Sequence, residues 1–151
     1  MLVSDGLLGE EEAPRVLDLY AGSGALAFEA LSRGASAAVL VEQARDAVSV
    51  IRENAAALGA QAEIRLFDAK VERALAKIEG PFGVVFLDPP YADVVTPAFA
   101  EVLAAAALLL APGGALVLEH GSSDEPPPIE GLDLDRSRKY GDTTLTLYRK
   151  T

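Results

Sequence analysis

Short apolar runs along the chain alternate with longer segments whose apolar residues recur at helical spacing. The first pattern predicts buried strands and the second predicts amphipathic helices, so the chain is expected to form successive strand–helix units. The predicted strands are residues 15–20, 37–41, 62–67, 84–87 and 115–118. The predicted helices are residues 25–32, 44–58, 69–78 and 96–110, with Gly59 ending the second and Pro112-Gly113-Gly114 stopping the last.

The C-terminal part departs from this alternation. Residues 132–140 and 143–150 alternate apolar with polar positions around Gly141-Asp142, a pattern that predicts an antiparallel hairpin. We therefore predict an α/β fold with a single Rossmann-like, doubly wound, mostly parallel seven-stranded sheet that ends in this hairpin.

Residues 121–131 include three consecutive prolines, Pro126 to Pro128, and are predicted to be a loop rather than a domain boundary. His120, just before this loop, is expected to be a strand-end residue with a backbone partner rather than a catalyst. No repeat or second domain is found, so residues 1–151 are predicted to form one domain, with residues 1–14 as an acidic lead-in.

Composition excludes several classes of protein. The chain has no cysteine and one histidine, which argues against disulfides, thiolate metal sites and histidine clusters, so no metal is expected. No apolar run reaches about 18 residues, so no membrane span is predicted. Met1 to Glu12 carries four acids and no base, unlike a secretory or mitochondrial leader. We therefore expect a cytoplasmic protein.

The net charge of −10 argues against a general nucleic-acid binder, because phosphate contacts need clustered Lys and Arg. The charge is uneven, however. Residues 136–151 hold five bases and one acid, so the other 135 residues carry −14. Any nucleic-acid contact is expected to be focused, and a solvated strand face is the alternative interpretation of the basic segment.

The fourth predicted strand ends at Asp88-Pro89-Pro90-Tyr91. Proline fixes φ and biases the preceding residue away from helix, which predicts a stiff turn. The Asp88 carboxylate and the Pro89 carbonyl are acceptors, and the Tyr91 ring offers a stacking surface. This set suits a planar base with an exocyclic amino group. In the alternative interpretation Asp88 caps the next helix and Tyr91 packs in the core.

The first strand is followed by a glycine turn, Ala21-Gly22-Ser23-Gly24, that leads into a helix. Glycine lets backbone amides approach a ligand, and a helix N-terminus offers unpaired N–H groups. Asp18, inside the strand, would repel a pyrophosphate but suits a ligand with an ammonium group. Glu42 ends the second strand, 24 residues after Asp18, where folds of this kind hold ribose hydroxyls.

Four acids, Asp18, Glu42, Asp68 and Asp88, thus lie in or just after the first four predicted strands. In an open, mostly parallel sheet, ligands bind outside the carboxyl ends of the strands, near the point where the strand order reverses. The alternative, that these acids only cap helices, accounts well for Asp68 and poorly for Asp18.

These motifs together resemble the class I S-adenosylmethionine-dependent methyltransferases, and the Asp-Pro-Pro-Tyr motif is similar to that of methylases acting on amino groups of nucleic-acid bases. More narrowly, residues 24–35 and 139–145 resemble the RsmD family, bacterial methylases of guanine-N2 in 16S ribosomal RNA. The likeness runs from about Arg15 to Arg149. It implies a methyltransferase that uses S-adenosylmethionine, releases S-adenosylhomocysteine and acts on 16S rRNA or the small ribosomal subunit.

Site roles follow from the resemblance. Asp18 and the Ala21–Gly24 backbone would hold the methionine end of the cofactor, Glu42 the ribose, and Asp68 with the Ala69 amide the adenine. Asp88 and the Pro89 carbonyl would hold the target amine. The implied cofactor-binding residues are Asp18, Tyr20, Ala21, Gly22, Ser23, Gly24, Glu42, Gln43, Asp68 and Ala69, and the implied catalytic residues are Asp88, Pro89 and Tyr91.

One departure concerns the start of the chain. Members of the family begin with a basic extension that contacts RNA, whereas fourteen mainly acidic or neutral residues precede the first strand here, so we expect a shortened N-terminus and weak RNA affinity. Two other functions stay open: a DNA adenine or cytosine amino methylase, and a non-catalytic cofactor-binding module for ribosome assembly. A monomer is expected.

Overall fold

The computed structural model describes residues 13–122 and 125–151, except for the side chain of Tyr91. Its strands are β1 (Arg15–Leu19), β2 (Ala37–Glu42), β3 (Ile64–Asp68), β4 (Phe82–Leu87), β5 (Leu110–Gly121), β6 (Leu132–Tyr140) and β7 (Thr143–Lys150). Its helices are α1 (Ala25–Ser32), α2 (Arg45–Leu58), α3 (Val71–Leu75), the 3-10 helix η2 (Tyr91–Val95) and α4 (Pro97–Leu108). No helix in these ranges is long and apolar enough to cross a membrane.

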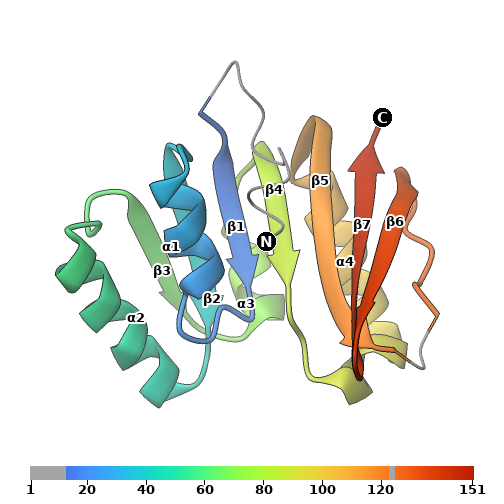
Figure 1. The fold of residues 1–151 in the computed structure, drawn as a ribbon, viewed down its shortest axis with the longest axis horizontal. Helices are drawn as coiled ribbons and strands as arrows, with labels where there is room; N and C mark the ends of the chain where they lie inside the picture. Colours follow the sequence, from blue (N-terminus) through green and yellow to red (C-terminus); the bar gives the residue numbers. More distant parts are fainter. Residues whose placement is uncertain (1–12, 123–124) are drawn as a thin grey trace.

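All seven strands form one sheet in the order β3-β2-β1-β4-β5-β7-β6 (Figure 1). Strands β1 to β5 are parallel, and β7 runs antiparallel to both β5 and β6. This confirms the predicted fold, including both strands of the C-terminal hairpin at the predicted residues. The strand order reverses between β1 and β4, so the carboxyl ends of these two neighbours mark the place where such sheets bind ligands.

The sheet is buried on both faces, because residues of alternate parity in the parallel strands enter two separate cores. Val16 packs with α1 and α2 on one face, whereas Leu17 and Leu19 pack with α3 and α4 on the other. Figure 1 shows α1 and α2 in front of β1 to β3, with α3 and α4 behind the sheet. The helices thus clamp the strands whose ends form the site.

Two elements differ from the prediction. Helix α3 spans only Val71–Leu75, because just two of its side chains, Val71 and Ala74, are buried against the sheet. Strand β5 begins at Leu110 and therefore includes Pro112-Gly113-Gly114, which was expected to precede it. The β4–β5 register shifts at this place, and a β-bulge admits a proline that a regular inner strand excludes. A Cβ at Gly114 would lie 2.8 Å from the Ala111 carbonyl oxygen, which explains the glycine.

His120 has the structural role expected of it. The ring is fully buried, with Nδ1 3.0 Å from the carbonyl oxygen of Gly121 and Nε2 2.7 Å from the Thr146 hydroxyl. Because a carbonyl can only accept, the proton lies on Nδ1 and the Thr146 hydroxyl donates to Nε2. The histidine therefore fastens β5 to β7.

Candidate active site

The carboxyl ends of β1, β2 and β4 bring three carboxylates together. Asp18 is paired in register with Leu40 of β2 and Phe86 of β4. Glu42 and Asp88 each follow these partners by two residues. Alternate residues of a strand point to the same face, which places all three acids on the α1 side of the sheet. The predicted convergence of these acids is present.

Asp18 is 2% exposed, and its Oδ2 atom has no hydrogen-bond partner among the described residues. Burial raises the pKa of this carboxyl well above its usual range, a hydrogen bond from the backbone of Ala27 lowers it, and the charges of Asp88 and Glu42 raise it further. No cation is among these influences. A positively charged ligand at this place would therefore stabilise the charged form of Asp18.

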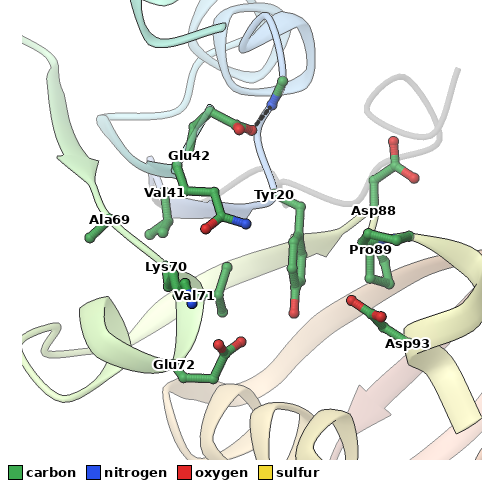
Figure 2. A pocket seen from close by; sticks show the side chains of 13 residues that line it. Tyr20, Val41, Glu42, Ala69, Lys70, Val71, Glu72, Asp88, Pro89 and Asp93 are labelled. Atoms are coloured by element: carbon green, nitrogen blue, oxygen red, sulfur yellow. Dashed lines mark hydrogen bonds between the residues drawn. The ribbon is translucent and has the colours of Figure 1, made fainter. Parts of the chain in front are cut away.

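The glycine turn is held rigidly. Glu42 accepts hydrogen bonds from the Gly22 N–H at 2.7 Å, drawn in Figure 2, and from the Ala44 N–H at 2.9 Å. Gly24 has a positive φ of 81°, and a Cβ there would lie 2.8 Å from the Phe28 ring. Tyr20 also has a positive φ, of 61°, which is uncommon outside glycine and typical of functional loops.

The turn differs from the prediction in what it can offer to a ligand. The Ala21 N–H donates to the Val41 carbonyl at 3.0 Å and the Gly24 N–H donates to the Ala21 carbonyl at 2.9 Å. With Gly22 bound to Glu42, these three amides are already paired. The turn therefore contributes close approach of its backbone and a fixed shape, and of its four amides only that of Ser23 has no partner among the described residues.

A cavity of about 720 Å³ runs along this edge of the sheet, a size typical of small-molecule sites. Its lining is Tyr20, Gly22, Val41, Glu42, Gln43, Ala69, Lys70, Val71, Glu72, Asp88, Pro89, Pro90 and Asp93. Five of the predicted cofactor residues are among them. The other five, Asp18, Ala21, Ser23, Gly24 and Asp68, lie outside this lining, and Asp18 is buried beneath the turn.

Tyr20 projects into the cavity between Glu72 and Asp93 (Figure 2). Its ring packs against Phe99 at a centroid distance of 6.3 Å. Burial, followed by the charges of Glu72 and Asp93, raises the pKa of the phenol, so the hydroxyl stays protonated and can donate. Glu72 and Asp93 were not predicted. Both lie in the first turn of the helical segment after a strand, so strand-end acids alone were too narrow a criterion.

The residues after β3 require one correction. The Ala69 N–H donates to the Glu42 carbonyl at 3.1 Å, so it is not available to read an adenine as expected. Ala69 instead lines the cavity and couples the ends of β2 and β3. Asp68 is exposed at the end of β3, opposite Glu42 in the strand register.

A second cavity, of about 550 Å³, lies on the other side of Asp88. Its lining is Leu26, Phe86, Leu87, Asp88, Val117, Glu119, Arg138, Tyr140, Thr143 and Leu145. Among the described residues, Asp88 alone lines both cavities. Pro89, which is buried, and Pro90 follow it along the first cavity. The ring of Tyr91 lies outside the described part of the structure, so its predicted stacking role stays a prediction.

Glu119 was missed, although it directly follows the fifth predicted strand, 115–118, as the predicted acids lie in or just after the first four; in the structure it lies within β5. A hydrogen bond with Asp88, then burial, then repulsion by the Asp88 charge raise the pKa of Glu119 to about 7. Glu119 is therefore partly protonated near pH 7, at a position on β5 beside the end of β4. Applying the strand-end criterion to β5 would have found it.

Comparison with known proteins agrees with this geometry. A Bacillus subtilis (strain 168) protein named "Putative rRNA methyltransferase YlbH" is 35% identical over 140 residues, covering 90% of this chain and 76% of that protein. The Ribosomal RNA small subunit methyltransferase D of Escherichia coli (strain K12) is 41% identical over 75 residues, covering 50% of this chain and 37% of that protein.

Among solved structures, the Escherichia coli "Putative methyltransferase yhhF" superposes with a TM-score of 0.83 at 29% identity, covering 99% of this chain and 82% of that one. The family model described as conserved hypothetical protein 95 matches residues 6–149. The chain therefore belongs to this family, the RsmD-like group of class I S-adenosylmethionine-dependent methyltransferases.

Proposed function

We propose that this protein transfers a methyl group from S-adenosylmethionine to the exocyclic N2 amine of a guanine in 16S ribosomal RNA, with residues 1–151 acting as one monomeric domain. The observation that carries the proposal is the position of Asp88. It follows β4 at the switch point of the sheet and forms part of the wall of both cavities. A side chain there can contact a methyl donor in one cavity and a methyl acceptor in the other.

The names of the relatives support the choice of substrate. The Bacillus subtilis relative is named as an rRNA methyltransferase, and the Escherichia coli relative as a methyltransferase of the small-subunit RNA. The Asp88-Pro89-Pro90-Tyr91 motif supports an amino group as the methyl acceptor, because it supplies two hydrogen-bond acceptors beside an aromatic ring.

The site fits a cationic cofactor. S-adenosylmethionine, when bound, supplies an activated methyl group and carries both an ammonium and a sulfonium charge. In the proposal, the negative charge of Asp18 attracts the ammonium group of the cofactor across the turn formed by Ala21, Gly22, Ser23 and Gly24. Glu42, whose oxygens each keep a second lone pair, and the neighbouring Gln43 accept the ribose hydroxyls. Tyr20 and Ala69 line the remaining part of the cavity, and Asp68 lies nearby at the end of β3.

Asp88 and the Pro89 carbonyl act on the target amine. An amine conjugated to a purine ring is a poor nucleophile, because its lone pair is delocalised. Two acceptors that hold both N–H groups favour a pyramidal nitrogen with its lone pair directed at the methyl group. Orientation of this kind contributes about 7–11 kcal/mol. The base must leave its stack, at a cost of a few kcal/mol, and stacking on Tyr91 would return about 1–3 kcal/mol.

The proposal is tested by methyl incorporation into small ribosomal subunits that lack the modification, followed by digestion of the RNA and identification of the methylated nucleoside. Asp88→Ala is expected to abolish transfer while cofactor affinity, measured by calorimetry, changes by only a few fold. Glu53→Ala, an exposed substitution on α2, serves as the control. Methylated adenine or cytosine in DNA, or no transfer by the wild-type protein, would contradict the proposal.

A further inference from the structure

We propose that Glu119 selects guanine, by accepting the N1–H of the target base in the second cavity while Asp88 holds the adjacent N2 amine. The inference rests on the proposed function and extends it to the residue that distinguishes guanine from other bases carrying an amino group.

The strand register positions the two acids for this task. Leu87 and Leu118 are partners in the parallel β4–β5 pair, so Asp88, just past the end of β4, lies beside Glu119 of β5. Both line the second cavity. A hydrogen bond with Asp88 is the largest cause of the raised pKa of Glu119, which is consistent with the two side chains lying close together. Guanine presents N1–H and N2–H as parallel donors on one edge, so two converging carboxylates match that edge.

The remainder of the cavity suits a flat ring. Leu26 from α1, Phe86 from β4, Val117 from β5 and Leu145 from β7 provide an apolar surface, and Tyr140 and Arg138 border it from β6. Figure 1 shows α1 and α2 in front of β1 to β3 only, so among the described residues no helix covers this face of β5 and β7. The cavity therefore has mainly apolar walls, and its hydrogen-bond acceptors Asp88 and Glu119 lie together beside the end of β4.

The chemistry separates guanine from its competitors. Beside its amino group guanine has a ring N–H, whereas adenine and cytosine have an unprotonated ring nitrogen, which is an acceptor. A charged Glu119 accepts a hydrogen bond from the ring N–H of guanine and repels the unprotonated ring nitrogen of adenine or cytosine. A site that is built to bind a substrate N–H rejects analogues that lack it, because the buried polar group is then left unpaired.

Charge bookkeeping agrees with this role. Because its pKa is about 7, Glu119 is partly protonated near pH 7. Two donors from guanine would replace that proton and allow both carboxylates to be charged. Guanine binding near pH 7 should therefore release a proton that binding of a base with an acceptor at N1 does not.

The experiment replaces the target guanine, once mapped, by 2-aminopurine, which keeps the 2-amino group but has no N1–H. Small subunits are reconstituted with 16S rRNA ligated from fragments that carry either base, and rates are compared at pH 8, where Glu119 is charged. Wild-type protein and the Glu53→Gln control should prefer guanine by about tenfold to a hundredfold more than Glu119→Gln does, since a hydrogen bond to a charged group contributes about 1.5–3 kcal/mol.

An equal preference in wild type and Glu119→Gln would overturn the inference while leaving the proposed function intact. Absence of guanine methylation by the wild type would overturn the proposed function itself and the inference with it. A second measurement avoids dependence on folding of the variant: calorimetry of the wild type in two buffers of different ionisation enthalpy. Guanine RNA should release more protons than 2-aminopurine RNA at pH 7, and equal release would also overturn the inference.

Discussion

The Glu42 carboxylate accepts the Gly22 N–H at 2.7 Å and thereby ties the end of β2 to the glycine turn that follows β1. The same carboxylate also holds the Ala44 N–H, at the start of α2. Glu42 therefore supports the shape of the site before any ligand is present, in addition to the ribose contact proposed for it.

We expect Glu42→Gln to weaken cofactor binding by about tenfold to a hundredfold, because the amide directs an NH2 group at one of two N–H donors and breaks a charge-assisted hydrogen bond. The melting temperature should fall as well, since the turn loses its anchor. Calorimetry and thermal unfolding measure the two effects, with Glu53→Gln as the control. Weaker binding at an unchanged melting temperature would show that Glu42 acts on the ligand alone.

Asp18→Asn should stabilise the ligand-free protein while impairing cofactor binding more than tenfold. Because the pKa of Asp18 is raised in the folded state, the folded protein holds this proton more tightly than the unfolded chain does. Stability is therefore lost as pH rises above the usual range of an aspartate, and the uncharged asparagine avoids that loss. At pH 8 we therefore expect a higher free energy of unfolding and a higher melting temperature for Asp18→Asn than for the wild type. A loss of stability at pH 8 would refute this account of Asp18.

The pH dependence of stability should also report on Glu119. Its folded-state pKa of about 7 lies above the ordinary value of 4.5, so its contribution to stability is fully present below pH 4.5 and is lost as pH rises through 7. Besides Asp88, just after β4, the titratable or charged groups that line the cavity with Glu119 are Arg138 and Tyr140 on β6. Urea unfolding from pH 5 to pH 8 should show wild type losing stability relative to Glu119→Gln. If the free energies of unfolding of the two proteins change in parallel with pH, the raised pKa of Glu119 is contradicted.

The basic residues of the hairpin should separate into two groups. Lys150 donates to the Ala107 and Leu110 carbonyls at 2.9 and 2.7 Å, at the end of α4, whereas Lys139 is exposed on β6. Lys150→Gln should cost about 0.5–1.5 kcal/mol of stability, because these carbonyls lose their donor.

Lys139→Gln should leave stability unchanged and weaken RNA binding, with a slope of log affinity against log salt smaller by about one. The measurement is binding to small subunits at several salt concentrations, alongside urea unfolding of both variants. A weakened Lys150→Gln complex with an unchanged Lys139→Gln complex would reverse the assignment.

Sequence reasoning located the fold well where local and tertiary preferences agree. The hairpin and α1 occur at the predicted residues, because turn chemistry and apolar spacing fix them locally. Residues 110–114 were misassigned because Pro112 and the two glycines have the composition of a loop, and only pairing with β4 turns them into a bulged strand. The shortness of α3 also depends on what the sheet leaves for it to cover.

The site was foreseeable in part. Acids at strand ends converge because parallel strands share one edge, which is a property of the pattern. Which amides are already paired, such as those of Gly22 and Ala69, depends on distances between loops that no spacing encodes. The raised pKa of Glu119 likewise depends on burial and on the proximity of Asp88, which appear only after folding.

Strand β7 lies between β5 and β6 in the sheet, although it is synthesised after both. During translation β5 would present an open edge until β7 emerges, and β6 would have no strand to join. Leu147 and Tyr148 of β7 are fully buried. The Tyr148 hydroxyl donates to the Pro127 carbonyl at 2.7 Å, so the proline-containing loop cannot make this contact until β7 is in place. Formation of the second cavity, whose walls come from α1 and from β4 to β7, is thus postponed until the hairpin has left the ribosome, and a nascent chain stalled after β6 would hold Asp88 and Glu119 without a complete binding pocket around them.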